Sequence, residues 1–151
     1  MNLRVIHVGK ASKLYRDAIE HYTSRIGHYA KFEIVEAKQA KRLPPDAAVD
    51  YEGERLIRAL GPNDVAIALS EEGKAMNSVA FARKLADIEI RSRPISLLIG
   101  GAYGLSVAVK SHADSIISLS KMTMQHDVAL IVTLEQLYRA MTIIRGENYH
   151  K

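Results

Sequence analysis

Hydrophobic residues recur along this chain in two alternating patterns. Five short apolar runs are typical of strands: residues 3–9, 31–37, 64–70, 94–100 and 115–120. The segments after them place apolar side chains at helical spacing: residues 13–28, 47–60, 78–92, 106–113 and 128–145. Strands that alternate with helices predict an α/β fold with a largely parallel sheet and helices on both faces.

The connections carry signals for turns and helix ends. Ser78 is expected to cap the third helix, and Asp127 to start the last one. Residues 39–47 (QAKRLPPDA) contain two prolines that disfavour regular structure, so this segment is predicted to be a mobile loop. Residues 71–77 (EEGKAMN) and 121–127 (KMTMQHD) are predicted to be loops as well.

Length and composition are those of one globular domain, with 151 residues, 48% hydrophobic and 25% charged. Cysteine is absent, which excludes disulfides, thiolate zinc sites and thiol nucleophiles. The first residues are strand-like and unlike a secretory signal, and no apolar run is long enough to cross a bilayer. We therefore expect a cytoplasmic protein without a membrane partner.

The net charge of +4 is unevenly distributed. Residues 1–42 contain nine Lys or Arg and four Asp or Glu, with Lys38, Lys41 and Arg42 close together. One interpretation is a solvated basic face. The other is a surface that contacts phosphates, because Lys and Arg supply the nonspecific part of nucleic-acid affinity. Composition does not separate the two.

Ligands of parallel α/β sheets bind in crevices beyond the carboxyl ends of the strands. Three predicted loops leave those ends: residues 70–77, 100–105 and 120–127. In the middle loop, Gly100 and Gly101 allow close backbone approaches that a Cβ would obstruct. The spacing GGxxG differs from the GxGxxG of dinucleotide sites, and the chain lacks a GxxxxGKS or GxxxxGKT phosphate loop. Periodicity alone leaves both a structural turn and a ligand site open.

Four motifs follow one another in the last third of the chain. They are LLIGGAYGLS (97–106), ISLSKMTMQH (117–126), LEQLYRA (134–140) and RGENYHK (145–151). Each is weak alone, but together and in this order they make the chain resemble the ribosomal large-subunit methyltransferase H family, small members of the SPOUT class. The resemblance spans the full length, and its specific motifs lie between residues 97 and 151.

The resemblance implies a single SPOUT domain over residues 1–151, with a trefoil knot near its C-terminus. It also implies a homodimer that uses S-adenosylmethionine (AdoMet) as methyl donor. The expected reaction is methylation at N3 of a pseudouridine, in a stem-loop of large-subunit rRNA within the assembled ribosome. No metal is expected, because His126 and His150 lack a metal-binding spacing.

The resemblance places the cofactor in the three loops. The residues expected to hold it are Leu69, Gly100, Gly101, Leu119, Ser120, Lys121, Met122, Thr123 and Met124. The backbone of the last six is expected to contact adenosine. For Met122 and Met124, core filling is an equally open explanation, since methionine fills cores well.

Methyl transfer requires alignment of donor and acceptor, exclusion of water and loss of the imide proton. The resemblance assigns this work to Arg139, Tyr149 and His150, with the tail reaching a site formed with the partner subunit. The structural alternatives are an i,i+4 pair of Arg139 with Glu135, and a frayed C-terminus. For His126, a capping or buried role is the alternative to a role in the site.

Two positions depart from the family pattern. Gln125 stands where a proline usually precedes the histidine, and Leu130 where an arginine is common. The first change could loosen the loop, and the second removes a cation that could contact phosphate or the partner subunit. The rival functions are a noncatalytic α/β module that binds RNA or a nucleotide, and a SPOUT methyltransferase acting on tRNA.

Overall fold

Five parallel strands form one sheet in the computed structural model, which describes all residues 1–151. The strand order is β2-β1-β4-β3-β5. The strands are β1 (Asn2–Val8), β2 (Lys31–Ala37), β3 (Val65–Ala75), β4 (Ile95–Ile99) and β5 (Ser115–Ser118). The predicted α/β class and the parallel sheet are confirmed.

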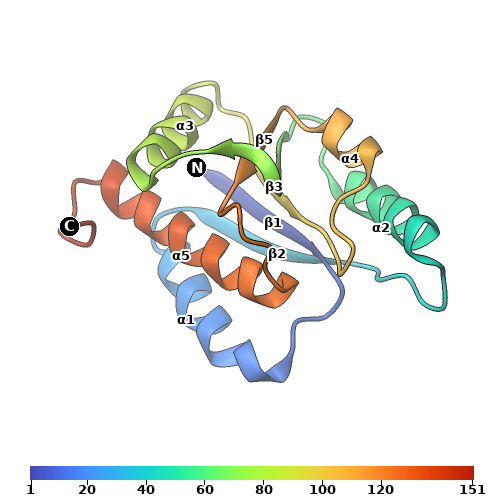
Figure 1. Cartoon of the computed structure of the whole chain (residues 1–151). Coiled ribbons are helices and arrows are strands. Elements are labelled where there is room, and N and C mark those ends of the chain that lie inside the picture. Colours follow the sequence, from blue (N-terminus) through green and yellow to red (C-terminus); the bar gives the residue numbers. More distant parts are fainter.

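Helices cover both faces of this sheet (Figure 1). The 3-10 helix η1 (Lys13–Tyr15) leads into α1 (Arg16–Gly27), and the other helices are α2 (Pro45–Ala59), α3 (Ser78–Ile90), α4 (Val107–His112) and α5 (His126–Ile144). On one face, α5 packs between α1 and α3 over the larger core, whose centre includes Leu97 and Leu134. On the other face, α2 and α4 pack together over a smaller core around Leu98 and Leu56.

The end of β3 differs from the sequence prediction. Residues 71–75 were expected in a loop, but β3 continues through them to Ala75. Ile117 of β5 pairs with both Leu69 and Lys74, so the intervening residues bulge out of the ladder. Gly73 lies in this bulge and packs against β5, where an added Cβ would be 2.6 Å from the Ile117 carbonyl carbon. Residues 71–75 are mostly exposed and therefore polar, so they lack the apolar pattern by which a strand is predicted from sequence.

Three helix starts also differ from expectation. Pro45 is the first residue of α2, where its missing N–H costs no hydrogen bond. Asn77, rather than Ser78, caps α3, because its Oδ1 accepts a 2.8 Å hydrogen bond from the Ala80 N–H. Gln125 precedes α5 without a side-chain cap, and Asp127 lies inside the first turn.

Candidate active site

A cavity of about 310 Å³ lies beyond the carboxyl ends of β4 and β5, beside residues 69–71 where β3 bulges. All three loops that the sequence singled out contribute to its wall. Of the nine residues expected to hold the cofactor, eight line it: Leu69, Gly100, Gly101, Leu119, Ser120, Met122, Thr123 and Met124. Lys121 is exposed and does not line the cavity.

The glycine turn owes its shape to contacts within the protein. A Cβ on Gly100 would lie 2.5 Å from the Gly104 carbonyl oxygen, and one on Gly101 would lie 2.5 Å from Oε2 of Glu52. Gly104 has a φ of +80°, and its N–H donates to the Gly101 carbonyl at 3.1 Å. Gly100 and Gly101 both line the cavity, so the prediction that their backbone approaches the cofactor stays a prediction. Their missing side chains leave room for the turn and for Glu52.

The loop after β5 forms the opposite wall. Ser120 turns this loop by accepting a 3.0 Å hydrogen bond at Oγ from the Met122 N–H. Met122 is 78% exposed although it lines the cavity, so core filling is excluded for its side chain. Met124 is half-buried in the same wall.

The first turn of α5, which follows this loop, also contributes to the cavity wall. His126 lines the cavity, and its Nε2 lies 3.3 Å from Oδ1 of the buried Asp127. Oδ2 of Asp127 accepts a 3.1 Å hydrogen bond from the Ser12 N–H. This contact ties the start of α5 to the segment after β1. His126 itself is the first residue of α5 and is only partly buried, so it neither caps the helix nor lies in the core.

Arg139, Tyr149 and His150 come together around Glu135. Arg139 donates to Oε1 of Glu135 from Nη2 at 2.7 Å and from Nε at 3.0 Å, and the Tyr149 hydroxyl donates to the same oxygen at 3.2 Å. The guanidinium stacks over the Tyr149 ring, 4.7 Å from its centroid, and Nη1 lies 3.3 Å from Nδ1 of His150. Because a guanidinium only donates, Nδ1 acts as the acceptor in this contact. The pair expected as a structural alternative is present, and it is part of a larger cluster.

The electrostatics of this cluster keep both hydrogen-bond donors protonated. Hydrogen bonding to Glu135 raises the pKa of Arg139 above its ordinary value. Desolvation, together with the nearby Glu135 carboxylate, raises the pKa of Tyr149. Tyr149 also packs edge-on against Tyr138, with ring centroids 4.7 Å apart, so the tail is not a frayed end.

The cluster around Glu135 and the cavity lie at different points along α5. Arg139 follows His126 by 13 residues in α5, which corresponds to about 20 Å of helix. His150 instead lines a second cavity of about 400 Å³, which shares only Leu69 and Leu119 with the first. The structure therefore brings the three residues expected to be catalytic together with one another, but it does not bring them to the cavity of their own chain.

Sequence reasoning missed several residues of the cavity wall. Glu71 and Tyr103 line it, and Tyr103 is 61% exposed. Tyr103 lay inside the GGAYG motif, where an exposed aromatic between glycines was a usable signal. Glu71 lay in a segment expected to be a loop and carried no signal. No group of three or more His, Cys, Asp or Glu side chains is arranged to hold a metal ion.

Comparison with known proteins identifies the family. Residues 1–150 match the family described as "Predicted SPOUT methyltransferase". The chain belongs to the SPOUT methyltransferases. A SPOUT relative from Anaeromyxobacter sp., named "Ribosomal RNA large subunit methyltransferase H", is 48% identical over the full length of both chains. A relative of the same name from Thermotoga maritima is 35% identical over 99% of each chain.

Solved structures support the SPOUT fold at low sequence identity. A putative methylase family protein from Neisseria gonorrhoeae aligns with a TM-score of 0.60 at 14% identity, over 91% of this chain and 81% of that one. The SpoU methyltransferase AviRb from Streptomyces viridochromogenes, in complex with the cofactor AdoMet, aligns with a TM-score of 0.52 at 19% identity. That alignment covers 97% of this chain and 59% of AviRb.

Proposed function

We propose that this chain transfers a methyl group from AdoMet to N3 of a pseudouridine in large-subunit rRNA on the assembled ribosome. The observation that carries the proposal is the cavity at the carboxyl ends of β4 and β5 and beside the bulge of β3, walled by the loops that the family motifs mark. Full-length relatives named for methylation of large-subunit rRNA support the same substrate class. The whole chain, residues 1–151, acts in this proposal as one SPOUT methyltransferase domain in the cytoplasm.

The cavity wall fits AdoMet in size and chemistry. Small-molecule sites in proteins start at about 300 Å³ and combine apolar walls with a few polar groups. Leu69 and Leu119 offer apolar surface to an adenine ring, while Ser120 and Thr123 add hydroxyls beside the loop backbone. Glu71 places a carboxylate at the wall, which suits a ligand that carries a sulfonium and an ammonium group.

The catalytic cluster suits the acceptor half of the reaction. When bound, AdoMet supplies a methyl carbon activated by a sulfonium sulfur, and the acceptor N3 must lose its proton as the N–C bond forms and the C–S bond breaks. Arg139 keeps its positive charge and can stabilise the imide oxygens as negative charge develops. Tyr149 offers a ring for stacking, and His150 offers a nitrogen that can take or relay a proton.

A homodimer would unite the two halves. The outward side of α5 carries Val128, Ile131 and Val132, which are exposed or only partly buried. An antiparallel pairing of α5 with a second copy would cover this apolar face. Because the cavity lies near the start of α5 and the cluster nearer its end, this pairing would also place the cluster of one subunit close to the cavity of the other. A two-fold interface would give two equivalent composite sites.

Labelled AdoMet and three substrates test the proposal: free rRNA, large subunits and assembled ribosomes, all prepared without the modification. We expect methylation of assembled ribosomes, with mass spectrometry placing the methyl group on N3 of a pseudouridine. Methylation of tRNA, tested in parallel, without methylation of any of the three would instead support a SPOUT methyltransferase that acts on tRNA. Failure of the folded protein to bind AdoMet in calorimetry would contradict the proposed methyltransferase activity. The alternative function, a noncatalytic RNA-binding module, would then remain.

A further inference from the structure

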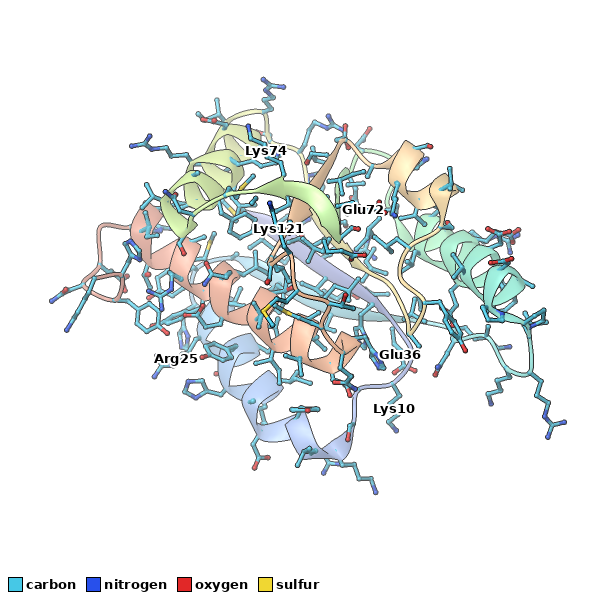
Figure 2. The ribbon with its side chains drawn as sticks, in the orientation of Figure 1. Lys10, Arg25, Glu36, Glu72, Lys74 and Lys121 are labelled. Atoms are coloured by element: carbon cyan, nitrogen blue, oxygen red, sulfur yellow. The ribbon has the colours of Figure 1, made fainter.

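Four cations gather beyond the carboxyl ends of the two strands that do not reach the cavity. Lys10 follows β1, and Lys38, Lys41 and Arg42 follow β2. The two strands are parallel neighbours, so these segments leave the sheet side by side. We call Lys10, Lys38, Lys41 and Arg42 the basic edge. Figure 2 shows Lys10 at this end of the sheet, close to Glu36 from the end of β2.

The basic edge is not neutralised by the protein. All four side chains are exposed, and none forms an ion pair or a side-chain hydrogen bond. The nearest carboxylates are the exposed Glu36 and Asp46 and the buried Glu52, whose Oε1 accepts from the Ala40 N–H, so an excess of one positive charge remains.

The opposite, amino edge of the sheet is different. There Arg4 pairs with Asp64 at 3.1 Å and with Glu33 at 3.4 Å, and the N-terminal ammonium pairs with Glu89 at 2.7 Å. These amino-edge charges are paired, although Lys31 and Arg91 at the same edge are not. All four cations of the basic edge, at the carboxyl edge of the sheet, are unpaired. This is the edge that also carries the cavity.

The segment after β2 is tied to the glycine turn of the cavity. The Gly9 N–H donates to the Ala37 carbonyl at 2.9 Å, and the Ala40 N–H donates to Oε1 of Glu52 at 3.0 Å. Glu52 is only 4% exposed, and its Oε2 occupies the space that a Cβ on Gly101 would need. One buried carboxylate thus holds the backbone between Lys38 and Lys41 and also packs against the turn that walls the cavity.

The distance from the cavity to the basic edge suits a nucleic-acid backbone. In the order β2-β1-β4, two strand spacings of about 4.8 Å separate β2 from β4, or about 10 Å. Phosphates of one strand recur about every 3.4 Å along a helical nucleic acid. A nucleotide presented at the cavity therefore places phosphates a few nucleotides away over the basic edge.

We propose that the basic edge binds the phosphate backbone of the RNA beside the methylated nucleotide. This inference rests on the proposed function and adds a contact surface to it. The cations would contribute affinity and orientation, without reading the base sequence, because phosphate contacts carry no sequence information. Glu52 holds Ala40 between Lys38 and Lys41, and all four cations lie on the edge of the sheet that carries the cavity. This placement beside the proposed methylation site favours RNA over an acidic protein or an anionic membrane.

The test compares two triple variants with the same change in charge. Lys38→Gln/Lys41→Gln/Arg42→Gln removes most of the basic edge. Lys31→Gln/Arg58→Gln/Arg91→Gln removes three exposed cations near the amino edge and serves as the control. The measurements are KM and kcat for ribosomal substrate, binding of the same substrate at several salt concentrations, and AdoMet affinity by calorimetry.

We expect the basic-edge variant to raise KM at least tenfold while kcat and AdoMet affinity stay within twofold. The slope of log affinity against log salt should become shallower by about 2 to 3, since each lost phosphate contact removes about 0.7 to 0.9. The control variant should differ little from the wild type, and Lys38→Arg/Lys41→Arg should retain wild-type KM.

Equal losses in the two triple variants would overturn the proposal, because they would reveal a general effect of charge. An unchanged KM and salt slope in the basic-edge variant would overturn it as well, as would a loss confined to binding of anionic lipid vesicles. A wild-type protein that binds AdoMet but methylates no RNA would instead contradict the proposed function. The two failures are therefore distinguishable.

Discussion

At the scale of single residues, the structure shows that the three glycines of the GGAYG turn have different surroundings, which the sequence could not distinguish. The GGAYG turn was recognisable as a place of close backbone approach, but periodicity could not say what approaches. Gly100 faces the Gly104 carbonyl, Gly101 faces the Glu52 carboxylate, and Gly104 faces open space at a positive φ. Glu52 escaped prediction because a buried carboxylate in an amphipathic helix looks in sequence like any surface glutamate.

This difference predicts an order of stability for alanine substitutions. Gly100→Ala should be the most damaging, at about 2 to 4 kcal/mol, because a backbone carbonyl 2.5 Å away cannot move without deforming the turn. Gly104→Ala should cost about 1 kcal/mol, the strain of a left-handed conformation with no steric conflict. Urea denaturation measures both. A Gly104→Ala variant less stable than Gly100→Ala would contradict the contacts described for this turn.

The residues proposed to be catalytic show a second limit of prediction from sequence. Spacing on α5 correctly predicted the pair between Arg139 and Glu135. It could not predict that Tyr149 would donate to the same carboxylate, since 14 residues and a turn separate the two. The roles of Arg139, Tyr149 and His150 came from the resemblance, and they remain part of the proposal.

At the scale of elements, the sequence predicted every helix and strand, and it failed where tertiary contacts override local pattern. Residues 71–75 are polar and contain Gly73, yet β5 pairs with them and extends β3. The two prolines expected to break structure instead start α2. The mobility expected for residues 39–47 stays a prediction. The trefoil knot also stays a prediction, and the pairing of β5 with both parts of β3 is compatible with it.

The C-terminal tail beyond Glu147 supports a prediction at this scale. Deleting residues 148–151 should leave AdoMet affinity within twofold, because no residue of the tail lines the first cavity. Methyl transfer should fall by at least a hundredfold, since a misplaced acceptor loses the advantage of alignment.

Stability should fall modestly in the deletion variant, because Tyr149 packs against Tyr138, whereas Glu147 keeps its 2.7 Å hydrogen bond from Tyr29. Arg139→Ala is the companion variant and should show the same loss of transfer. Calorimetry, urea denaturation and the ribosome methylation assay separate the three effects. Wild-type transfer by the truncated protein would remove Tyr149 and His150 from the mechanism.

A second prediction concerns the junction of β1, β3 and β4 at the amino edge. Asp64 accepts hydrogen bonds from Ser96 Oγ at 2.6 Å, the Gly61 N–H at 2.9 Å and Arg4 Nη1 at 3.1 Å. Burial of the carboxyl opposes its ionisation, but the hydrogen bonds from Ser96 and Gly61 and the charge of Arg4 outweigh this, so the pKa of Asp64 is lowered. The ionised carboxylate therefore stabilises the folded state.

The sign of this shift sets the pH dependence. A carboxyl with a lowered pKa stabilises the fold above its unfolded pKa of about 4, and this contribution is lost as pH falls below that value. Asp64→Asn should therefore be less stable than the wild type at pH 7, with the gap narrowing as the pH falls below about 4. Asp50→Asn, at an exposed position, is the matched control. A gap for Asp64→Asn that does not change between pH 7 and pH 3 would contradict the assigned hydrogen bonds.

At the scale of the whole molecule, the single chain contains both parts of the proposed active site but does not join them. The α/β class and the position of the cavity were predictable, because parallel sheets place ligands at the carboxyl ends of their strands. The arrangement of Tyr149 and His150 around Glu135, away from the cavity, was not predictable, since it depends on how the tail folds back onto its own helix. No helix combines the length and apolar character needed to span a membrane.

The composite site predicts complementation between two inactive variants. Arg139→Ala removes the acceptor cluster and leaves the cavity intact, while Thr123→Trp fills the cavity with an indole and leaves the cluster intact. Each should be inactive alone. In a mixed dimer, one of the two sites would combine an intact cavity with an intact cluster, so mixing the variants should restore up to about a quarter of wild-type transfer.

Sedimentation must first show a dimer at micromolar concentration, and Val128→Lys should shift it toward the 16.8 kDa monomer. The same substitution should abolish complementation without weakening AdoMet binding, because Val128 does not line the cavity. If the mixture stays inactive although mixed dimers form, cavity and cluster must meet within one chain. The tail would then have to leave Glu135 and move along α5 during the reaction, and the cluster described here would be a resting arrangement.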